Sequence, residues 1–511
     1  MKMDILHNLL QGFGTALSLQ NLLACFLGAL IGTVVGVLPG IGPVGAMSLL
    51  LPFSFGLDAG TSLILLAGIF YGAMYGGSTT SILINLPGEA ASVVTCIDGY
   101  QMAKKGRAGA ALAVVAIGSF VAGTLGVVLL MLFAPPLGKA ALAFGPPEYF
   151  GIALIGMLLL SNLTGDSFLK AFLVFVLGMM ISTIGIDALT GFNRLSFGLL
   201  ELTRGVEFLP CAMGLFGLAE VFDIALQPYK TADTIKVKFR ELYPSREEIK
   251  RSVWPILRGA FVGFPIGLIP GPAAIMSSLV SYRLERGVAK KPEEFGKGAI
   301  EGVAGPESAN NAAAAGTMVP LLALGIPFAP ATAVLLGGLM IHGVAPGPTF
   351  MTSHANLFWL VIASMYIGNL MLLVFNLPMV GLFASLTKVP PRILVPIVTA
   401  LMLLGAYSVN NSAFDMVMLL FFGLLGFLFK CLGFTSTPLL VGMVLGPVFE
   451  KGLRQSLILA DGDLLFFLKR PISGTMMAVA GLIVLWVIVG GAREMIKARE
   501  AKDTGEAEEP V

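Results

Sequence analysis

Charged side chains are scarce in this sequence: they make up only 12% of its 511 residues. Soluble globular proteins carry about twice that share, so the composition excludes a soluble enzyme and a disordered chain. Lys and Arg total 32 and Asp and Glu total 30, which leaves no basic face for a nucleic acid. No Walker motif is present, so ATP hydrolysis by this chain is not expected.

Cysteine and histidine are also few, at four and three residues. The cysteines lie in apolar stretches without a CxxC pair, and we interpret them as small buried apolar residues. The histidines lack the spacing of metal ligands, so no metal site and no cofactor is expected. The first long apolar run, 22–38, has no small-residue cleavage site and is interpreted as a retained membrane segment.

Apolar residues are abundant instead, at 56% of the chain. Because a spanning helix needs about 20 apolar residues, the sequence predicts an all-α polytopic membrane protein with about 10–12 transmembrane helices. Lys and Arg concentrate in four regions, 98–109, 227–258, 281–298 and the tail from 493, which the positive-inside rule places in the cytoplasm. The connection 343–356 has no Lys or Arg and is expected outside.

The spacing of glycine and proline residues reveals an internal repeat. Two ladders with glycine at every fourth position are separated by 231 residues: Gly28, Gly32, Gly36 and Gly40, then Gly259, Gly263, Gly267 and Gly271. A second match, at 240 residues, pairs Pro87 with Pro327 and Ser92 with Thr332. The chain therefore contains two homologous halves.

The charge pattern predicts that these halves are inverted. The stretch 98–109 after the break of the first half is basic, whereas its counterpart in the second half is uncharged. Inverted repeats are a common plan of secondary transporters. We expect a first repeat with Pro-Gly breaks (20–125), connecting transmembrane helices (126–226), a cytoplasmic loop (227–255), a second repeat (256–350), C-terminal transmembrane helices (351–491) and a cytoplasmic tail (492–511).

Proline beside glycine interrupts both halves. Broken backbone at membrane depth is tolerated only where it is buried or lines a wet cavity, and in transporters it supplies N–H groups to anions and carbonyls to ions. A re-entrant hairpin tip and a plain kink are both consistent with these breaks, and the glycine ladders suit close helix packing. The expected break residues are Pro39, Gly40, Pro87, Gly88, Pro270, Gly271 and Pro327.

Hydroxyl and amide side chains gather beside the breaks of both halves. They suit recognition of a carboxylate and Na⁺, and the alternative is polar contact between helices. Glu89 is a candidate for proton coupling and equally for a helix cap. A Na⁺ ion is expected, if anywhere, near Ser78 and Asn310. The candidate substrate- or ion-binding residues are Ser78, Thr79, Asn85, Ser92, Asn310, Asn311, Thr317 and Thr332.

Four stretches carry a strong family resemblance: "GVLPGIGP" (36–43), "YGGSTTSILINLPGEAASVVTCIDGYQMAKKGRAG" (75–109), "GPESANNAAAAGTMVPLLALGIP" (305–327) and "LLGGLMIHGVAPGP" (335–348). They resemble the large membrane subunit of the tripartite tricarboxylate transporter family (TctA-like). The resemblance implies a secondary transporter of the bacterial inner membrane that takes up tricarboxylates such as citrate, or dicarboxylates, with Na⁺ or H⁺ as coupling ion. It also implies a small four-helix membrane subunit and a periplasmic solute-binding protein as partners.

Two other classes of function are weighed against uptake. A passive channel or a structural membrane subunit would share the same composition and differ in transport against a gradient. An intramembrane enzyme would need a catalytic pair, and the polar clusters contain no Asp or His. We therefore expect a protein that is not an enzyme.

Overall fold

The computed structural model describes residues 2–38, 42–163, 167–187, 189–226, 243–385 and 391–503. Within these residues the only sheet is the antiparallel pair β1 (Gly185–Ile186) and β2 (Asn193–Arg194). Seven described helices are long and apolar enough to cross a membrane, and five shorter apolar helices accompany them. The chain is an all-α polytopic membrane protein, as the composition predicts.

The N-terminal part consists of paired helices with short connections. Ser18 caps the second helix by accepting a hydrogen bond from the Asn21 N–H, and Asp58 caps the fourth by accepting from Gly60 and Thr61. The elements are α1 (Lys2–Ala16), α2 (Leu19–Val37), α3 (Gly42–Leu50), η1 (Leu51–Gly56), α4 (Ala59–Ile84), η2 (Ala90–Ser92), α5 (Val93–Lys104) and α6 (Ala108–Ala141).

The middle of the chain leads into the second repeat. Ser245 and Glu248 form a reciprocal capping box at the start of the helix that carries the second glycine ladder. The elements are α7 (Pro146–Leu163), α8 (Phe168–Ser182), η3 (Glu201–Arg204), α9 (Phe208–Ala212), the π-helix η4 (Met213–Leu218), α10 (Ala219–Leu226), α11 (Arg246–Gly267), α12 (Ala273–Val288), η6 (Pro292–Glu294), α13 (Glu301–Leu324) and α14 (Pro330–Ile341).

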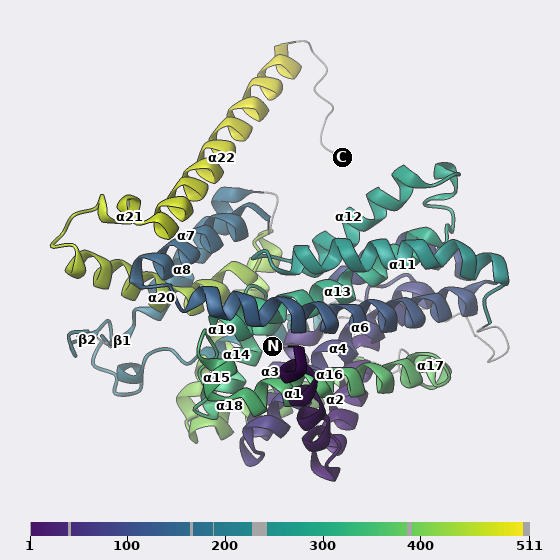
Figure 1. Cartoon of the computed structure of the whole chain (residues 1–511), viewed down its shortest axis with the longest axis horizontal. Helices are drawn as coiled ribbons and strands as arrows, with labels where there is room; N and C mark the ends of the chain where they lie inside the picture. The colour runs from purple at the N-terminus through teal and green to yellow at the C-terminus, as the bar shows by residue number, and fades with distance from the viewer. Residues whose placement is uncertain are drawn as a thin grey trace.

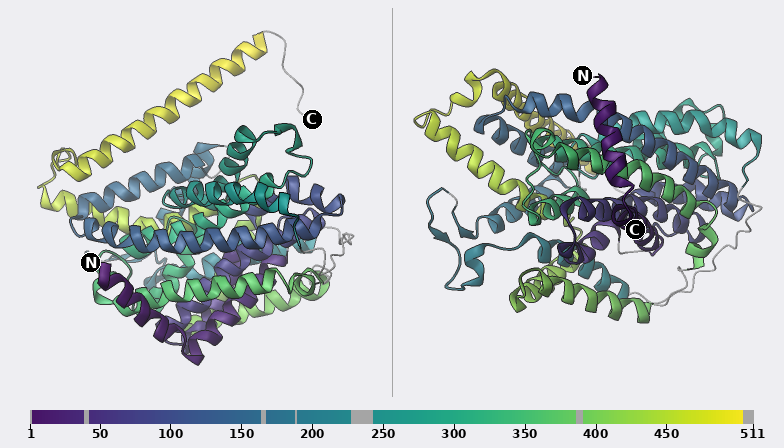
Figure 2. Two further views of the ribbon diagram at one scale, coloured as in Figure 1. Left: turned by 45° about the vertical axis from the view of Figure 1, so that its right-hand side comes forward. Right: turned by 60° about the horizontal axis from the view of Figure 1, so that its bottom comes forward.

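The C-terminal part ends in a helix that projects from the packed helices. Figures 1 and 2 show α22 projecting away from the packed helices, while α6 runs across the middle of the molecule. The elements are α15 (Phe350–Ser353), α16 (Ala355–Asn376), α17 (Val380–Ala384), α18 (Pro391–Asn410), α19 (Ala413–Cys431), α20 (Thr437–Leu459), α21 (Phe466–Lys469) and α22 (Pro471–Asp503).

The glycine ladders make the same contacts in both halves. A Cβ added at Gly28 or Gly32 would meet the carbonyl oxygen of Leu65 or Ile69 on α4. Added at Gly259 or Gly263 of α11, it would meet the carbonyl oxygen of the corresponding residue of α13, which lies 240 positions further along the chain. Close helix packing is therefore what these ladders do.

The central helices α4 and α13 also end alike. Asn85 after α4 and Gly325 after α13 both have left-handed backbone, with φ of 58° and 73°. Each is followed by a proline and a new helix start. Every residue from Gly302 to Leu324 is buried, so α13 lies at the centre of the described structure. The limits of the six segments and the inversion of the halves stay predictions.

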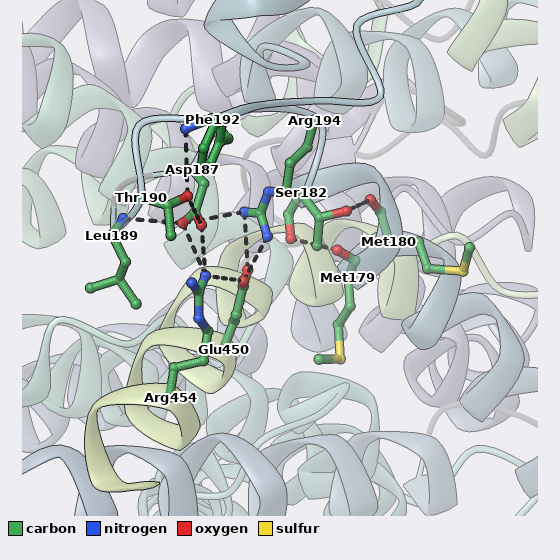
Figure 3. Close-up of polar contacts among 11 residues, drawn as sticks. Met179, Met180, Ser182, Asp187, Leu189, Thr190, Phe192, Arg194, Glu450 and Arg454 are labelled. Atoms are coloured by element: carbon green, nitrogen blue, oxygen red, sulfur yellow. Dashed lines mark hydrogen bonds and ion pairs between the residues drawn. The ribbon is translucent and has the colours of Figure 1, made fainter. Parts of the chain in front are cut away.

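A group of ion pairs fastens the β1–β2 connection to α20 (Figure 3). Arg454 donates to Asp187 and to Glu450, both at 2.9 Å, and Arg194 donates to Glu450 at 2.7 Å. Asp187 also accepts from the Thr190 hydroxyl at 2.6 Å. The hydrogen bonds that Asp187 accepts, from Thr190 foremost and also from Arg454, hold the pKa of its carboxyl well below the ordinary value.

Candidate functional site

A cavity of about 630 Å³ lies where the breaks of the two halves meet. This volume is in the range of small-molecule sites. Its walls include the first residues of four elements, which form two equivalent pairs: α3 with α12, and η2 with α14. The first N–H groups of a helix have no acceptor within the helix, so helix N-termini attract anions.

The described residues that line the cavity include no Lys or Arg. Their charged members are Glu89 and Glu220, and Glu220 is paired with Lys430 at 3.0 Å. The remaining walls are largely apolar, with Phe70 and Phe216 among them. An anion here would be held by helix N-termini and backbone N–H groups rather than by a cationic side chain.

The predicted break residues that the structure describes lie at or next to this cavity. Pro87, Gly88 and Gly271 line it directly. Pro270 immediately precedes Gly271, and Pro327 lies in the connection from α13 to α14, whose N-terminal residues line it. Pro39 and Gly40 lie outside the described residues, which resume on either side of this break at Leu38 and Gly42.

The predicted binding residues divide into three groups, of which the first reaches the cavity. Only Thr317 belongs to it. This residue lines the cavity, and its hydroxyl donates a hydrogen bond to the Ala314 carbonyl oxygen at 2.7 Å.

The second group consists of residues that shape the helix ends. Ser92 Oγ lies 2.8 Å from the Glu89 carbonyl oxygen, and Thr332 Oγ1 lies 2.8 Å from the Ala329 carbonyl oxygen, so these two hydroxyls close equivalent turns. Asn85 is exposed at the left-handed end of α4 and does not line the cavity.

The third group is a buried polar cluster between the halves. Asn311 Nδ2 donates to Asn310 Oδ1 at 2.7 Å and to Ser119 Oγ at 2.9 Å. Ser78 and Asn310 lie beside the carboxyl group of Glu307. All members are buried, and Thr79, the next residue of α4, is buried as well. The structure thus brings together Ser78 and Asn310, the pair expected near Na⁺.

Glu89 occupies the boundary between the cavity and the protein interior. Its Oε2 accepts a hydrogen bond from the Ala91 N–H at 2.8 Å, so the residue caps η2, as one of the two interpretations requires. Its other oxygen, Oε1, is buried without a hydrogen-bond partner. The role of Glu89 in proton coupling stays a prediction.

Two acidic residues near the cavity, Glu307 and Glu220, were not among the predicted site residues. Glu307 lies in the polar run of α13, where an ionisable group inside an apolar helix was a usable signal. Glu220 belongs to α10, an otherwise mostly apolar segment. The sequence does not show which groups either residue faces, because those groups belong to helices that are far away along the chain.

These features define a polytopic membrane protein whose interrupted helices bound a cavity. The family described as "Tripartite tricarboxylate transporter TctA family" matches residues 22–441, and the chain belongs to it. Membership makes it a large subunit of the tricarboxylate-transporter type and confirms the resemblance read from the sequence. The family's tripartite nature implies partner subunits.

Two relatives from Agrobacterium vitis carry descriptions without a function. One, an "Uncharacterized 52.8 kDa protein in TAR-I ttuC' 3'region", is 47% identical over 96% of this chain and 98% of its own length. The other, an "Uncharacterized protein in TAR-II ttuC' 3'region", is 42% identical over 45% of this chain and 96% of its own length. No solved structure matches the chain.

Proposed function

We propose that this chain is the permease subunit of an ion-coupled secondary transporter that imports tricarboxylates or dicarboxylates across the bacterial inner membrane. It works with a small four-helix membrane subunit and receives its substrate from a periplasmic solute-binding protein. The coupling ion is Na⁺ or H⁺. The loop 227–255 and the C-terminus lie in the cytoplasm.

The observation that carries the proposal is the convergence of four helix starts on one cavity. The starts of α3, α12 and α14 bring backbone N–H groups and the positive end of a helix dipole to the cavity wall, whereas the Ala91 N–H of η2 is capped by Glu89. A carboxylate with two or three negative groups can be shared among several such ends, and a co-bound cation offsets the remaining charge. The lining acids favour an accompanying cation.

A substitution at Ala274, in the first turn of α12, tests the anion site. Ala274→Asp places a negative charge at the cavity wall, where it competes with the substrate for the N-terminus of α12. We expect a loss of uptake of at least about tenfold, since about 1.4 kcal/mol of lost binding corresponds to a factor of ten. Ala274→Asn has nearly the same shape without the charge and should retain most of the uptake.

The measurement is uptake of labelled citrate and a panel of dicarboxylates into proteoliposomes. These contain the chain with its small subunit, with and without binding protein, under imposed Na⁺ or H⁺ gradients. Accumulation that requires both gradient and binding protein supports the proposal. Downhill carboxylate flux that is equal with and without an imposed ion gradient would support a passive channel. An equal loss of uptake in both Ala274 variants would show a packing effect rather than an anion site.

A further inference from the structure

Among the residues that the structure describes, no cationic side chain forms an ion pair with the buried carboxyl group of Glu307. Its side chain is fully buried near the start of α13, where Oε2 accepts a hydrogen bond from Thr95 Oγ1 at 2.8 Å. Oε1 has no hydrogen-bond partner. Among the described residues, no Lys, Arg or His forms an ion pair with Glu307 or with Glu89.

Two further polar atoms beside Glu307 also lack partners. They are Ser78 Oγ and Asn310 Nδ2, both on fully buried side chains that face the Glu307 carboxyl group without forming a hydrogen bond of good geometry. Buried polar atoms without partners are rare in proteins and call for an explanation. Here four such atoms, counting one oxygen each of Glu89 and Glu307, belong to neighbouring side chains at the junction of the two halves.

Other charged groups on the helices packed against α13 are already engaged. Glu285 of α12 is paired with Arg258 of α11, with Nε to Oε1 at 2.9 Å. Asp98 of α5 accepts from the Tyr282 hydroxyl and from the backbone just before α13, including the Ala299 N–H at 2.8 Å.

The remaining titratable groups that face Glu307 are Tyr75 of α4 and Glu89. Tyr75 donates its hydroxyl to Asn369. Glu89 interacts electrostatically with Glu307 and also lines the cavity. Glu307 thus faces one acid, which connects it to the cavity, and no base.

We infer that Glu307 is a proton-binding residue of the transport cycle and that Glu89 lies between it and the cavity. This inference rests on the proposed function. An ionised carboxylate buried without a cation is costly, so a proton stabilises this arrangement. In the transfer, an O–H bond breaks at Glu89 and an O–H bond forms at Glu307, and no electrons are exchanged.

The donor set favours a proton over a divalent metal ion, and the addition of Na⁺ in the experiment below separates a proton from Na⁺. Within the described residues no group of three or more His, Cys, Asp or Glu side chains could hold a metal. Hard cations such as Ca²⁺ and Mg²⁺ take about six or more oxygen ligands, whereas a proton needs one carboxyl oxygen. Ser78 Oγ can then accept from, and Asn310 Nδ2 donate to, the protonated group.

Infrared difference spectroscopy of the purified full-length chain tests the proton directly. A change from neutral to alkaline pH should remove the carbonyl band of a protonated carboxylic acid. That band should be absent in Glu307→Gln, shifted in Ser78→Ala, and unchanged in Glu247→Gln, an exposed acid at the start of α11. A spectrum of Glu307→Gln identical to wild type, or loss of the band on adding Na⁺ at constant pH, would overturn the inference.

A transport assay separates coupling from structure. Glutamine mimics protonated Glu307, so Glu307→Gln should keep carboxylate counterflow and lose accumulation driven by a pH gradient, while Glu307→Asp should retain part of both. Accumulation of wild-type size in a folded Glu307→Gln would contradict the inference. If the wild-type chain exchanges no carboxylate, the proposed function fails, and the infrared result still decides whether Glu307 binds a proton.

Discussion

At the scale of single residues, Asp187 shows how one carboxylate can fasten a connection to a helix. Its pKa lies below the ordinary value because Thr190, the Leu189 N–H and Arg454 all stabilise its ionised form. A carboxyl group of this kind contributes stability that is complete above the ordinary Asp pKa of about 3.9 and is lost as pH falls through the lower folded-state pKa.

We therefore expect Asp187→Asn to lower the thermal midpoint at pH 7. The difference from wild type should shrink as the pH is lowered below about 4, because the carboxyl of the unfolded chain then becomes protonated, while the native carboxyl does so only at its lower pKa. Thermal unfolding in detergent across this pH range measures it. Asp461→Asn, at an exposed position after α20, is the control and should show little difference. A difference that is independent of pH would contradict the ionic explanation.

At the scale of helices, the two glycine ladders set the distance between paired helices. A Cβ at Gly32 would lie 2.5 Å from the Ile69 carbonyl oxygen and 2.8 Å from the Gly72 Cα, both backbone atoms that cannot rotate away. Helix pairs built on such contacts are held by close packing rather than by the hydrophobic effect, because lipid tails are as apolar as the helices. Even one methyl group should therefore separate α2 from α4.

Gly32→Ala should destabilise the protein by about 1–3 kcal/mol, the usual cost of overpacking. Gly263→Ala should do the same between α11 and α13, since it meets the equivalent carbonyl. Gly14→Ala is the matched control: a Cβ there has no neighbour within 4 Å, so it should raise stability by up to about 1 kcal/mol through helix propensity. Unfolding of the three variants in detergent gives the comparison, and equal effects would contradict the packing argument.

The sequence predicted the repeated elements because their signals are local and periodic. The 240-residue match placed the ends of α4 and α13, and the paired residues Ser92 and Thr332 fill the same place in equivalent turns. The candidate site was harder to predict, because a polar residue near a break can shape a helix end as readily as bind a ligand. Asn85 illustrates this: its left-handed conformation suits a helix end, where asparagine is tolerated.

The grouping of Glu307 with Ser78 and Thr95 could not be predicted, for a different reason. These residues belong to opposite halves of the molecule and meet only because α13 packs among helices of the first repeat. Sequence periodicity shows which helix a residue lies on, whereas the partner across a helix interface depends on the packing of the whole chain.

At the scale of the whole molecule, we predict from the charge pattern that the two halves are inverted, which would explain how the cavity is built. The starts of α3 and α12 both reach this cavity, and each follows a glycine-ladder helix. If α2 and α11 enter the membrane from opposite sides, their following helices meet near its middle, as in transporters with inverted repeats. The ends of α5 and α14 should then lie on opposite faces.

Single cysteines test this in a chain whose four native cysteines have been replaced. Lys104→Cys, in the exposed last turn of α5, should react with a membrane-impermeant maleimide only in inside-out vesicles, because the basic residues around it belong in the cytoplasm. Ala345→Cys, exposed in the uncharged connection after α14, should react only from the outside. Glu247→Cys serves as the cytoplasmic reference. If Lys104→Cys and Ala345→Cys react from the same side, the halves run parallel, and the four helix starts cannot approach the cavity from both membrane faces.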